Sequence, residues 1–91
     1  MNPNQLTVRE HLLLYLVNEK GQDGISKETC CHEAYGRQTA IDIVEETLDQ
    51  LWEHGLVVNL GHYRGYKYYI TKKGSYILTH YLRPLPDLKL G

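Results

Sequence analysis

The spacing of the hydrophobic positions changes along the chain. Over residues 6–19 and 40–51, apolar side chains recur every three or four residues, the period of an amphipathic helix. Over residues 56–60 and 66–70 the period is two, which is typical of strands, and a glycine-flanked segment, 61–65, separates these two runs. The pattern therefore predicts helices in the first part of the chain and a β-hairpin in the second.

Capping signals place the first two helices. Thr7, followed three residues later by Glu10, has the pattern of a capping box and predicts the start of the first helix. Ser26 is expected to cap a second helix over residues 27–35, and Gly36 is expected to end it. The first helix is apolar over most of its circumference, so we expect it to be buried on more than one side.

Similar signals place two later helices. A third helix is expected to be capped by Thr39 and to end before Gly55, where a helix prefers glycine. After the hairpin, Ser75 is expected to cap a fourth helix that Pro84 stops. Only a few residues separate the second and third helices, which is the arrangement of a helix-turn-helix.

Length and composition fit one domain. Ninety-one residues with a hydrophobic content of 42% are enough for a single core. We expect a flexible leader over residues 1–5, a folded domain over 6–83 and an extended tail over 84–91. No apolar run approaches the roughly 20 residues of a membrane span, and the N-terminus lacks the pattern of a signal peptide. The sequence therefore predicts a cytoplasmic protein without a membrane partner.

The net charge of −1 conceals a division of the chain. Residues 1–53 carry ten acidic side chains against four basic ones, a net −6, whereas residues 54–91 carry six basic ones against one acidic, a net +5. Six of the eight tyrosines lie in the basic part. An uneven distribution of this kind indicates a face that binds a polyanion.

Three stretches carry a resemblance to a known family. They are LDQLWEHGLV at residues 48–57, YYITKKG at 68–74 and, more weakly, GISKE at 24–28. Together with the order of the elements, they resemble the winged helix-turn-helix domain of prokaryotic transcription regulators, most closely the MarR and PadR groups. The resemblance implies an α+β fold with a three-helix core, a β-hairpin wing and a C-terminal helix.

The resemblance also implies a function and the residues that perform it. Regulators of this fold place the third helix in the major groove of double-stranded DNA and the wing against the adjacent phosphates. Arginine suits guanine edges and glutamine suits adenine edges, so Arg37 and Gln38 are candidates for base contacts. Carried over by position, the DNA-binding residues are Lys27, Arg37, Gln38, Thr39, His62, Tyr63, Arg64 and Lys67.

A homodimer is the expected assembly. The apolar surface of the first and fourth helices exceeds what one small core can cover, and a dimer would read a pseudo-palindromic site. The residues expected in the dimer interface are Leu14, Tyr15, Tyr76, Ile77, Tyr81 and Leu82.

The third helix departs from the family pattern. Its five acidic side chains would face repulsion from phosphate, and it carries no lysine or arginine. Either only its first turn enters the groove, with Arg37 and the wing supplying the positive field, or the acidic face binds a basic protein partner without any DNA. The acidic residues concerned are Asp42, Glu45, Glu46, Asp49 and Glu53.

The remaining candidate chemistry is sparse. Cys30 and Cys31 would point about 100° apart on a helix, so they are poorly placed to chelate one ion. We expect one of them in the core and the other as a partly exposed thiol. The sequence contains no motif for catalysis, a metal site or a cofactor.

Two aromatic residues of the second half are assigned structural positions. By alternation Tyr66 shares a face with Tyr68 and Ile70, so we expect it in the core. Trp52 follows the core position Leu51 and is expected to pack under the wing or at an interface.

Overall fold

The computed structural model describes residues 6–36, 41–62 and 65–80. Over these ranges the chain is a small α+β domain with four α-helices, a short 3-10 turn and one antiparallel hairpin, as the sequence predicted at this level. None of the described helices is both long and apolar enough to cross a membrane. The elements are α1 (Val8–Lys20), η2 (Gly21–Asp23), α2 (Lys27–Tyr35), α3 (Ile41–Glu53), β1 (Val57–His62), β2 (Gly65–Ile70) and α4 (Lys72–His80).

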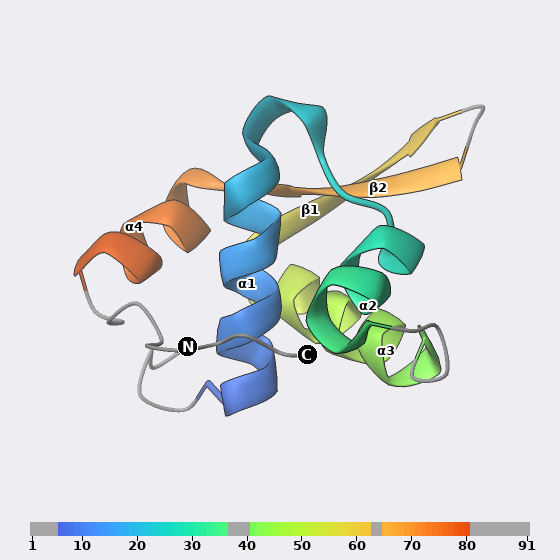
Figure 1. Cartoon of the computed structure of the whole chain (residues 1–91). Coiled ribbons are helices and arrows are strands. Elements are labelled where there is room, and N and C mark those ends of the chain that lie inside the picture. Colours follow the sequence, from blue (N-terminus) through green and yellow to red (C-terminus); the bar gives the residue numbers. More distant parts are fainter. Residues whose placement is uncertain (1–5, 37–40, 63–64, 81–91) are drawn as a thin grey trace.

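Helix α1 lies at the centre of the domain (Figure 1). It contacts α2 and α3 on one side and α4 on the other, and β2 also packs against it. The far end of the hairpin projects beyond the helices (Figure 1). This arrangement explains why α1 is apolar over most of its circumference, because Leu13, Leu14 and Val17 are fully buried among different elements of the same chain.

The predicted caps of the first two helices are confirmed. The Thr7 hydroxyl accepts a hydrogen bond from the Glu10 amide (3.1 Å), and the Glu10 carboxylate accepts one from the Thr7 amide (2.9 Å). Ser26 Oγ accepts a hydrogen bond from the Thr29 amide (3.1 Å), and Gly36 ends α2 in the left-handed conformation with φ 73°. The side chains therefore satisfy amide groups that each helix start leaves unpaired.

The turn from α3 into the hairpin depends on Gly55. Its φ is 76°, its amide donates to the Trp52 carbonyl (2.9 Å), and the Leu56 amide donates to the Leu51 carbonyl (3.0 Å). These two bonds form a Schellman motif, which requires a residue in the left-handed region and so favours glycine. The predicted helix end is confirmed, whereas Thr39, the predicted start, lies outside the described residues.

The hairpin register runs from the pair Val57 and Ile70 to the pair His62 and Gly65. Ile25, just before α2, forms a one-residue antiparallel bridge with β2, so a third extended segment lies beside the hairpin. Its amide donates to the Tyr68 carbonyl (2.9 Å), and the Tyr68 amide donates to its carbonyl (2.8 Å). The start of α2 is thus held against the hairpin.

The start of α4 differs from the prediction. Thr71, not Ser75, caps this helix, because Thr71 Oγ1 accepts a hydrogen bond from the Gly74 amide (3.0 Å) and the Thr71 carbonyl accepts one from the Ser75 amide (2.9 Å). The Thr71 hydroxyl also donates to the Gly55 carbonyl (2.7 Å). Thr71 thereby joins the α3 turn to the start of α4, and residues 72–74 already belong to that helix.

Both cysteines are fully buried, so the prediction of one exposed thiol is wrong. Cys30 and Cys31 point in different directions, but α2 packs against α1, α3 and β2, so both directions lead into the core. Burial raises the pKa of the Cys30 thiol to about 12, which keeps it protonated at neutral pH. Cys30 therefore behaves as a small hydrophobic side chain.

A candidate binding cleft between α3 and the hairpin

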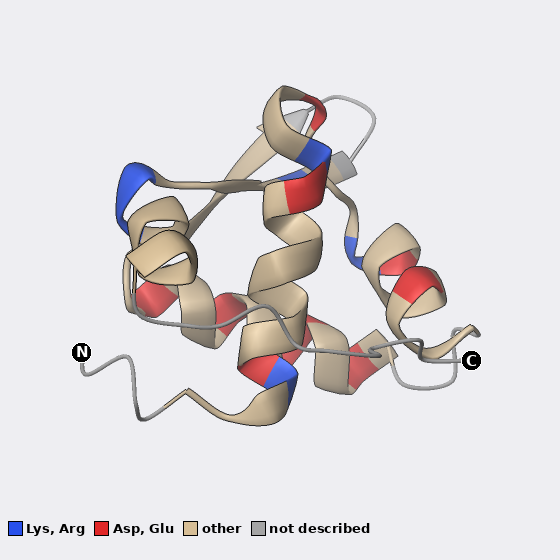
Figure 2. Ribbon diagram, turned by 60° about the vertical axis from the view of Figure 1, so that its left-hand side comes forward, with Lys and Arg blue, Asp and Glu red and all other residues tan. Residues whose placement is uncertain are grey.

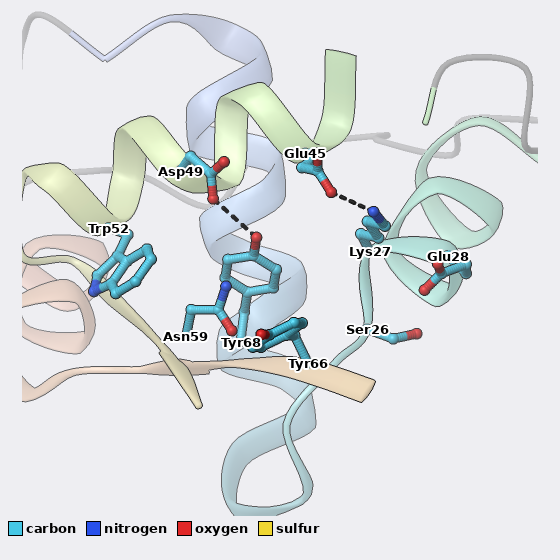
Figure 3. A pocket seen from close by; sticks show the side chains of 9 residues that line it. All are labelled: Ser26, Lys27, Glu28, Glu45, Asp49, Trp52, Asn59, Tyr66 and Tyr68. Atoms are coloured by element: carbon cyan, nitrogen blue, oxygen red, sulfur yellow. Dashed lines mark hydrogen bonds and ion pairs between the residues drawn. The ribbon is translucent and has the colours of Figure 1, made fainter. Parts of the chain in front are cut away.

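A cleft of ≈ 580 Å³ opens between α3, the hairpin and the start of α2 (Figure 3). The three elements come from separate parts of the chain. The Ile25–Tyr68 bridge brings the start of α2 beside β2 and so places it at the cleft. Glu45, Asp49 and Trp52 enter from α3 at spacings of four and three residues, which place them on one helical face. The lining residues are Ser26, Lys27, Glu28, Glu45, Asp49, Trp52, Asn59, Tyr66 and Tyr68.

An ion pair crosses one side of the cleft. The Lys27 ammonium donates a hydrogen bond to the Glu45 carboxylate, and both side chains keep part of their surface in solvent (Figure 3). This hydrogen bond raises the pKa of Lys27 above its usual range. The residue predicted to contact a phosphate therefore points to a carboxylate of α3 in this structure.

A hydrogen bond closes the floor of the cleft. The Tyr68 hydroxyl, on a side chain that is only 3% exposed, donates to Asp49 Oδ1 (2.9 Å; Figure 3). Burial, and then this bond to a carboxylate, raise the pKa of Tyr68 well above its usual range. The phenol therefore stays neutral and can hold Asp49 in a fixed position.

Two aromatic side chains remain in solvent at the cleft. Trp52 is 47% exposed and Tyr66 is 69% exposed, so the prediction that Tyr66 lies in the core is wrong. Alternation does place Tyr66 on the face of Tyr68, but Tyr66 pairs with Gly61 in the part of the hairpin that projects beyond the helices. No helix covers the Tyr66 ring there, and the ring lies over Gly61.

The cleft has an acidic lining. Three carboxylates and one ammonium give a formal net charge of −2 from Glu28, Glu45, Asp49 and Lys27. The acidic positions continue along α3 outside the cleft, where Asp42, Glu46 and Glu53 are exposed (Figure 2).

Asn59 contributes an unusual acceptor to the same cleft. Its Oδ1 atom is buried and accepts no hydrogen bond from the described residues. Figure 3 shows Asn59 between Trp52 and the two tyrosines. A buried acceptor without a donor is uncommon in a folded domain, and a bound N–H group would satisfy it.

The predicted DNA-binding residues do not gather at this cleft. Lys67 points to the opposite face of β2 from Tyr66 and Tyr68, where its ammonium donates to the Asp23 carbonyl (3.3 Å). The side chain of His62 is not described. Five further predicted DNA-binding residues lie outside the described part of the chain: Arg37, Gln38, Thr39, Tyr63 and Arg64.

The predicted dimer residues divide into three groups. Leu14 and Ile77 are 0% and 4% exposed, so their side chains are used within one chain and are not available to a partner. The prediction overlooked that α2, α3 and the hairpin also cover α1. Tyr15 and Tyr76 are exposed, at 38% and 52%. Tyr81 and Leu82 lie outside the described residues.

Sequence reasoning missed Asn59 and the cleft itself. The spacing of Glu45, Asp49 and Trp52 was a usable signal for one face of a helix. The pairing of Lys27 with Glu45 could not be predicted from the sequence, because it joins residues 18 positions apart and depends on how α2 packs on α3. Among the described residues, no three side chains of histidine, cysteine, aspartate or glutamate are grouped to hold a metal ion.

Comparison with protein-family models, with characterised proteins and with solved structures finds no match to this chain.

Proposed function

We propose that this protein is a winged helix-turn-helix regulator that binds double-stranded DNA. The observation that carries the proposal is the placement of α2 and α3 against each other beside a hairpin that projects past the helices (Figure 1). In a winged helix the hairpin is the wing, α3 is the helix at the major groove and the pairing of Ile25 with β2 supplies the short third strand.

The charges of α3 restrict how DNA would bind. A helix whose exposed surface is acidic along its length would be repelled by phosphates on both sides of the groove. We therefore propose that only the first turn of α3 and the residues before it, Arg37, Gln38 and Thr39, reach the bases. The phosphate contacts then come from the wing, through His62, Tyr63, Arg64 and Lys67.

Lys27 would join those contacts only after leaving Glu45. The Lys27 ammonium would exchange one anion for another, the Glu45 carboxylate of the free protein for a DNA phosphate in the complex. Phosphate at the start of a helix benefits from the helix dipole, which favours the exchange.

The proposed assembly on DNA is a homodimer formed through the exposed faces of α1 and α4. Tyr15, Tyr76, Tyr81 and Leu82 remain as interface candidates. A two-fold dimer would place two α3 helices about 34 Å apart, one turn of DNA, on a pseudo-palindromic site.

A second candidate is a winged helix that binds a basic protein partner through the acidic face of α3. The observation that favours it is the charge of that surface. Over residues 41–53 the helix carries five carboxylates and no lysine or arginine. The Lys27 ammonium, which comes from α2, neutralises only one of these carboxylates, that of Glu45.

Selection of bound sequences from a random duplex pool tests the first proposal. Enrichment of a palindrome is the expected result. The double variant Arg64→Ala, Lys67→Ala should lose retention of the enriched duplex and flatten its salt dependence. Absence of binding by the wild-type protein at about 50 mM salt, where phosphate contacts are strong, would reject DNA binding and favour the protein partner.

A further inference from the structure

We propose that the cleft between α3 and the hairpin binds an organic cation, namely a primary ammonium or guanidinium group carried on an alkyl chain. The inference goes beyond DNA binding, because it assigns a ligand to a site of which the proposed DNA contacts use only Lys27. Three features of the lining support it: its charge, its exposed rings and its unpaired acceptor.

The charge of the cleft favours a cation. The lining contains three carboxylates, Glu28, Glu45 and Asp49, and a single ammonium, that of Lys27. A carboxylate has acceptor capacity for several donors, so Asp49 can bind a further N–H group while it holds the Tyr68 hydroxyl. The start of α2 attracts an anion, but one of its amides, that of Thr29, already donates to Ser26 Oγ, and the three carboxylates of the lining outweigh it in formal charge.

The rings of the cleft favour an organic cation over a hydrated metal ion. Trp52 and Tyr66 leave large aromatic surfaces in solvent at the two sides of the cleft, and Tyr68 forms its buried floor. A cation over the face of tryptophan or tyrosine is attracted by the ring, and the alkyl part of the ligand gains apolar contact with the same surface. Metal ions would require several converging ligands, and among the described residues no three histidine, cysteine, aspartate or glutamate side chains are grouped to hold one.

Asn59 supplies a position for the N–H group. Asn59 lines the cleft, and its Oδ1 is buried without a donor from the described residues. Ammonium and guanidinium groups carry several N–H donors, so one ligand can satisfy Asn59 and a carboxylate together. Neither inorganic anions nor plain hydrocarbons offer that combination.

Lys27 already shows the chemistry of the proposed ligand. It is an alkyl ammonium that binds Glu45 at the edge of the cleft. A cationic ligand therefore competes with Lys27 for Glu45. Removing this lysine should strengthen binding of a cation, because Glu45 is released and the formal charge of the lining changes from −2 to −3.

Fluorescence titration of the whole protein tests the proposal. Trp52 is the only tryptophan of the chain and lines the cleft, so its emission reports directly on the site. The probes are spermidine, a free polyamine, and a blocked peptide with one arginine between glycines. We expect a saturable change in Trp52 emission that weakens with added salt. Response to spermidine alone would assign a free polyamine as the ligand, and response to the peptide alone would assign a protein side chain.

Charge-matched variants separate this site from general attraction to an acidic protein. Lys27→Gln should tighten binding by about two- to fivefold, the range expected for release of an exposed ion pair. Lys20→Gln removes the same charge from a pair with Glu33 outside the cleft and should leave the affinity unchanged. Equal effects of the two variants would overturn the proposal.

A second set of variants removes parts of the cleft. Tyr66→Leu and Glu45→Gln should weaken binding severalfold, whereas Glu46→Gln, at an exposed position of α3 outside the lining, should not. Circular dichroism establishes that each variant is folded. If neither probe changes Trp52 emission at up to about 10 mM in the wild type or in Lys27→Gln, the cleft is not a cation site. No DNA is present in these titrations, so their outcome is independent of the proposed DNA binding.

Discussion

The Tyr68 hydroxyl donates a 2.9 Å hydrogen bond to the Asp49 carboxylate and thereby joins the middle of β2 to the middle of α3. The rest of the Tyr68 ring is buried in the core, and its backbone pairs with Ile25 just before α2. One residue thus connects the hairpin to both helices that border the cleft. Its position fixes the distance between α3 and the hairpin.

Tyr68→Phe should lower the stability of the domain by about 1.5 kcal/mol. The substitution keeps the buried ring and removes only a hydrogen bond to a charged acceptor, which is typically worth about that amount. Chemical denaturation measures the change. Tyr66→Phe is the matched control on the same strand, and its largely exposed ring predicts a change within about 0.5 kcal/mol. Equal losses for both variants would mean that the Tyr68–Asp49 bond does not hold α3 to the hairpin.

Gly74→Ala should destabilise the domain although alanine is the better helix former. A methyl group at Gly74 would overlap the Leu56 carbonyl oxygen and press on the Ile70 side chain, because α4 packs directly on the turn before β1. Overpacking against backbone costs about 1–3 kcal/mol, more than the roughly 1 kcal/mol that alanine gains in a helix. Thermal unfolding of Gly74→Ala and of Ser75→Ala, one position along the same helix, compares the two effects. A Gly74→Ala protein as stable as the wild type would contradict the close approach.

The sequence predicted those features of the fold that depend on a few neighbouring residues. The caps at Thr7 and Ser26 and the glycine at the end of α3 were predictable because a cap joins residues three positions apart. The start of α4 was placed four residues late, because Thr71 gains its position from a contact with Gly55, 16 residues earlier.

The candidate site was less predictable than the fold. Alternation gives the face on which Tyr66 lies, but it does not tell where the covering helices end, so an exposed ring was placed in the core. The partner of Lys27 is likewise set by how two helices pack. The acidic character of α3 was predictable from composition, whereas its meeting with Trp52, Asn59 and Tyr66 around one cleft required the tertiary structure.

Stability should fall as the pH is lowered below about 6.5, through His11. Burial lowers the pKa of this histidine below its usual value of about 6.5, so the folded state disfavours the charged form. Between the unfolded and folded pKa values the unfolded chain binds more protons, and unfolding becomes easier as the pH falls through that window. The melting temperature of the wild type, taken relative to that of His11→Gln at the same pH, should fall as the pH is lowered through this range.

The exposed His32 provides the control for this titration. His32→Gln makes the same substitution at a histidine whose side chain lies in solvent on α2. If His11→Gln shows the same acid sensitivity as the wild type, the loss of stability arises from other groups and the burial of His11 has no effect on it.

Lys67→Ala should reduce the salt dependence of DNA binding, provided that the hairpin serves as a wing. The Lys67 side chain is exposed on the face of β2 opposite the acidic cleft, so it can reach a phosphate without approaching the carboxylates of α3. Loss of one phosphate contact lowers the slope of log K against log salt concentration by about 0.9. Lys73→Ala is the control, because its ammonium donates to the His54 carbonyl at the other end of the hairpin and should leave the slope unchanged. Binding of the selected duplex is measured for the three proteins over a series of salt concentrations. A slope for Lys67→Ala equal to that of the wild type would remove this strand from the DNA contact, and an equal decrease for Lys73→Ala would indicate attraction by net charge alone.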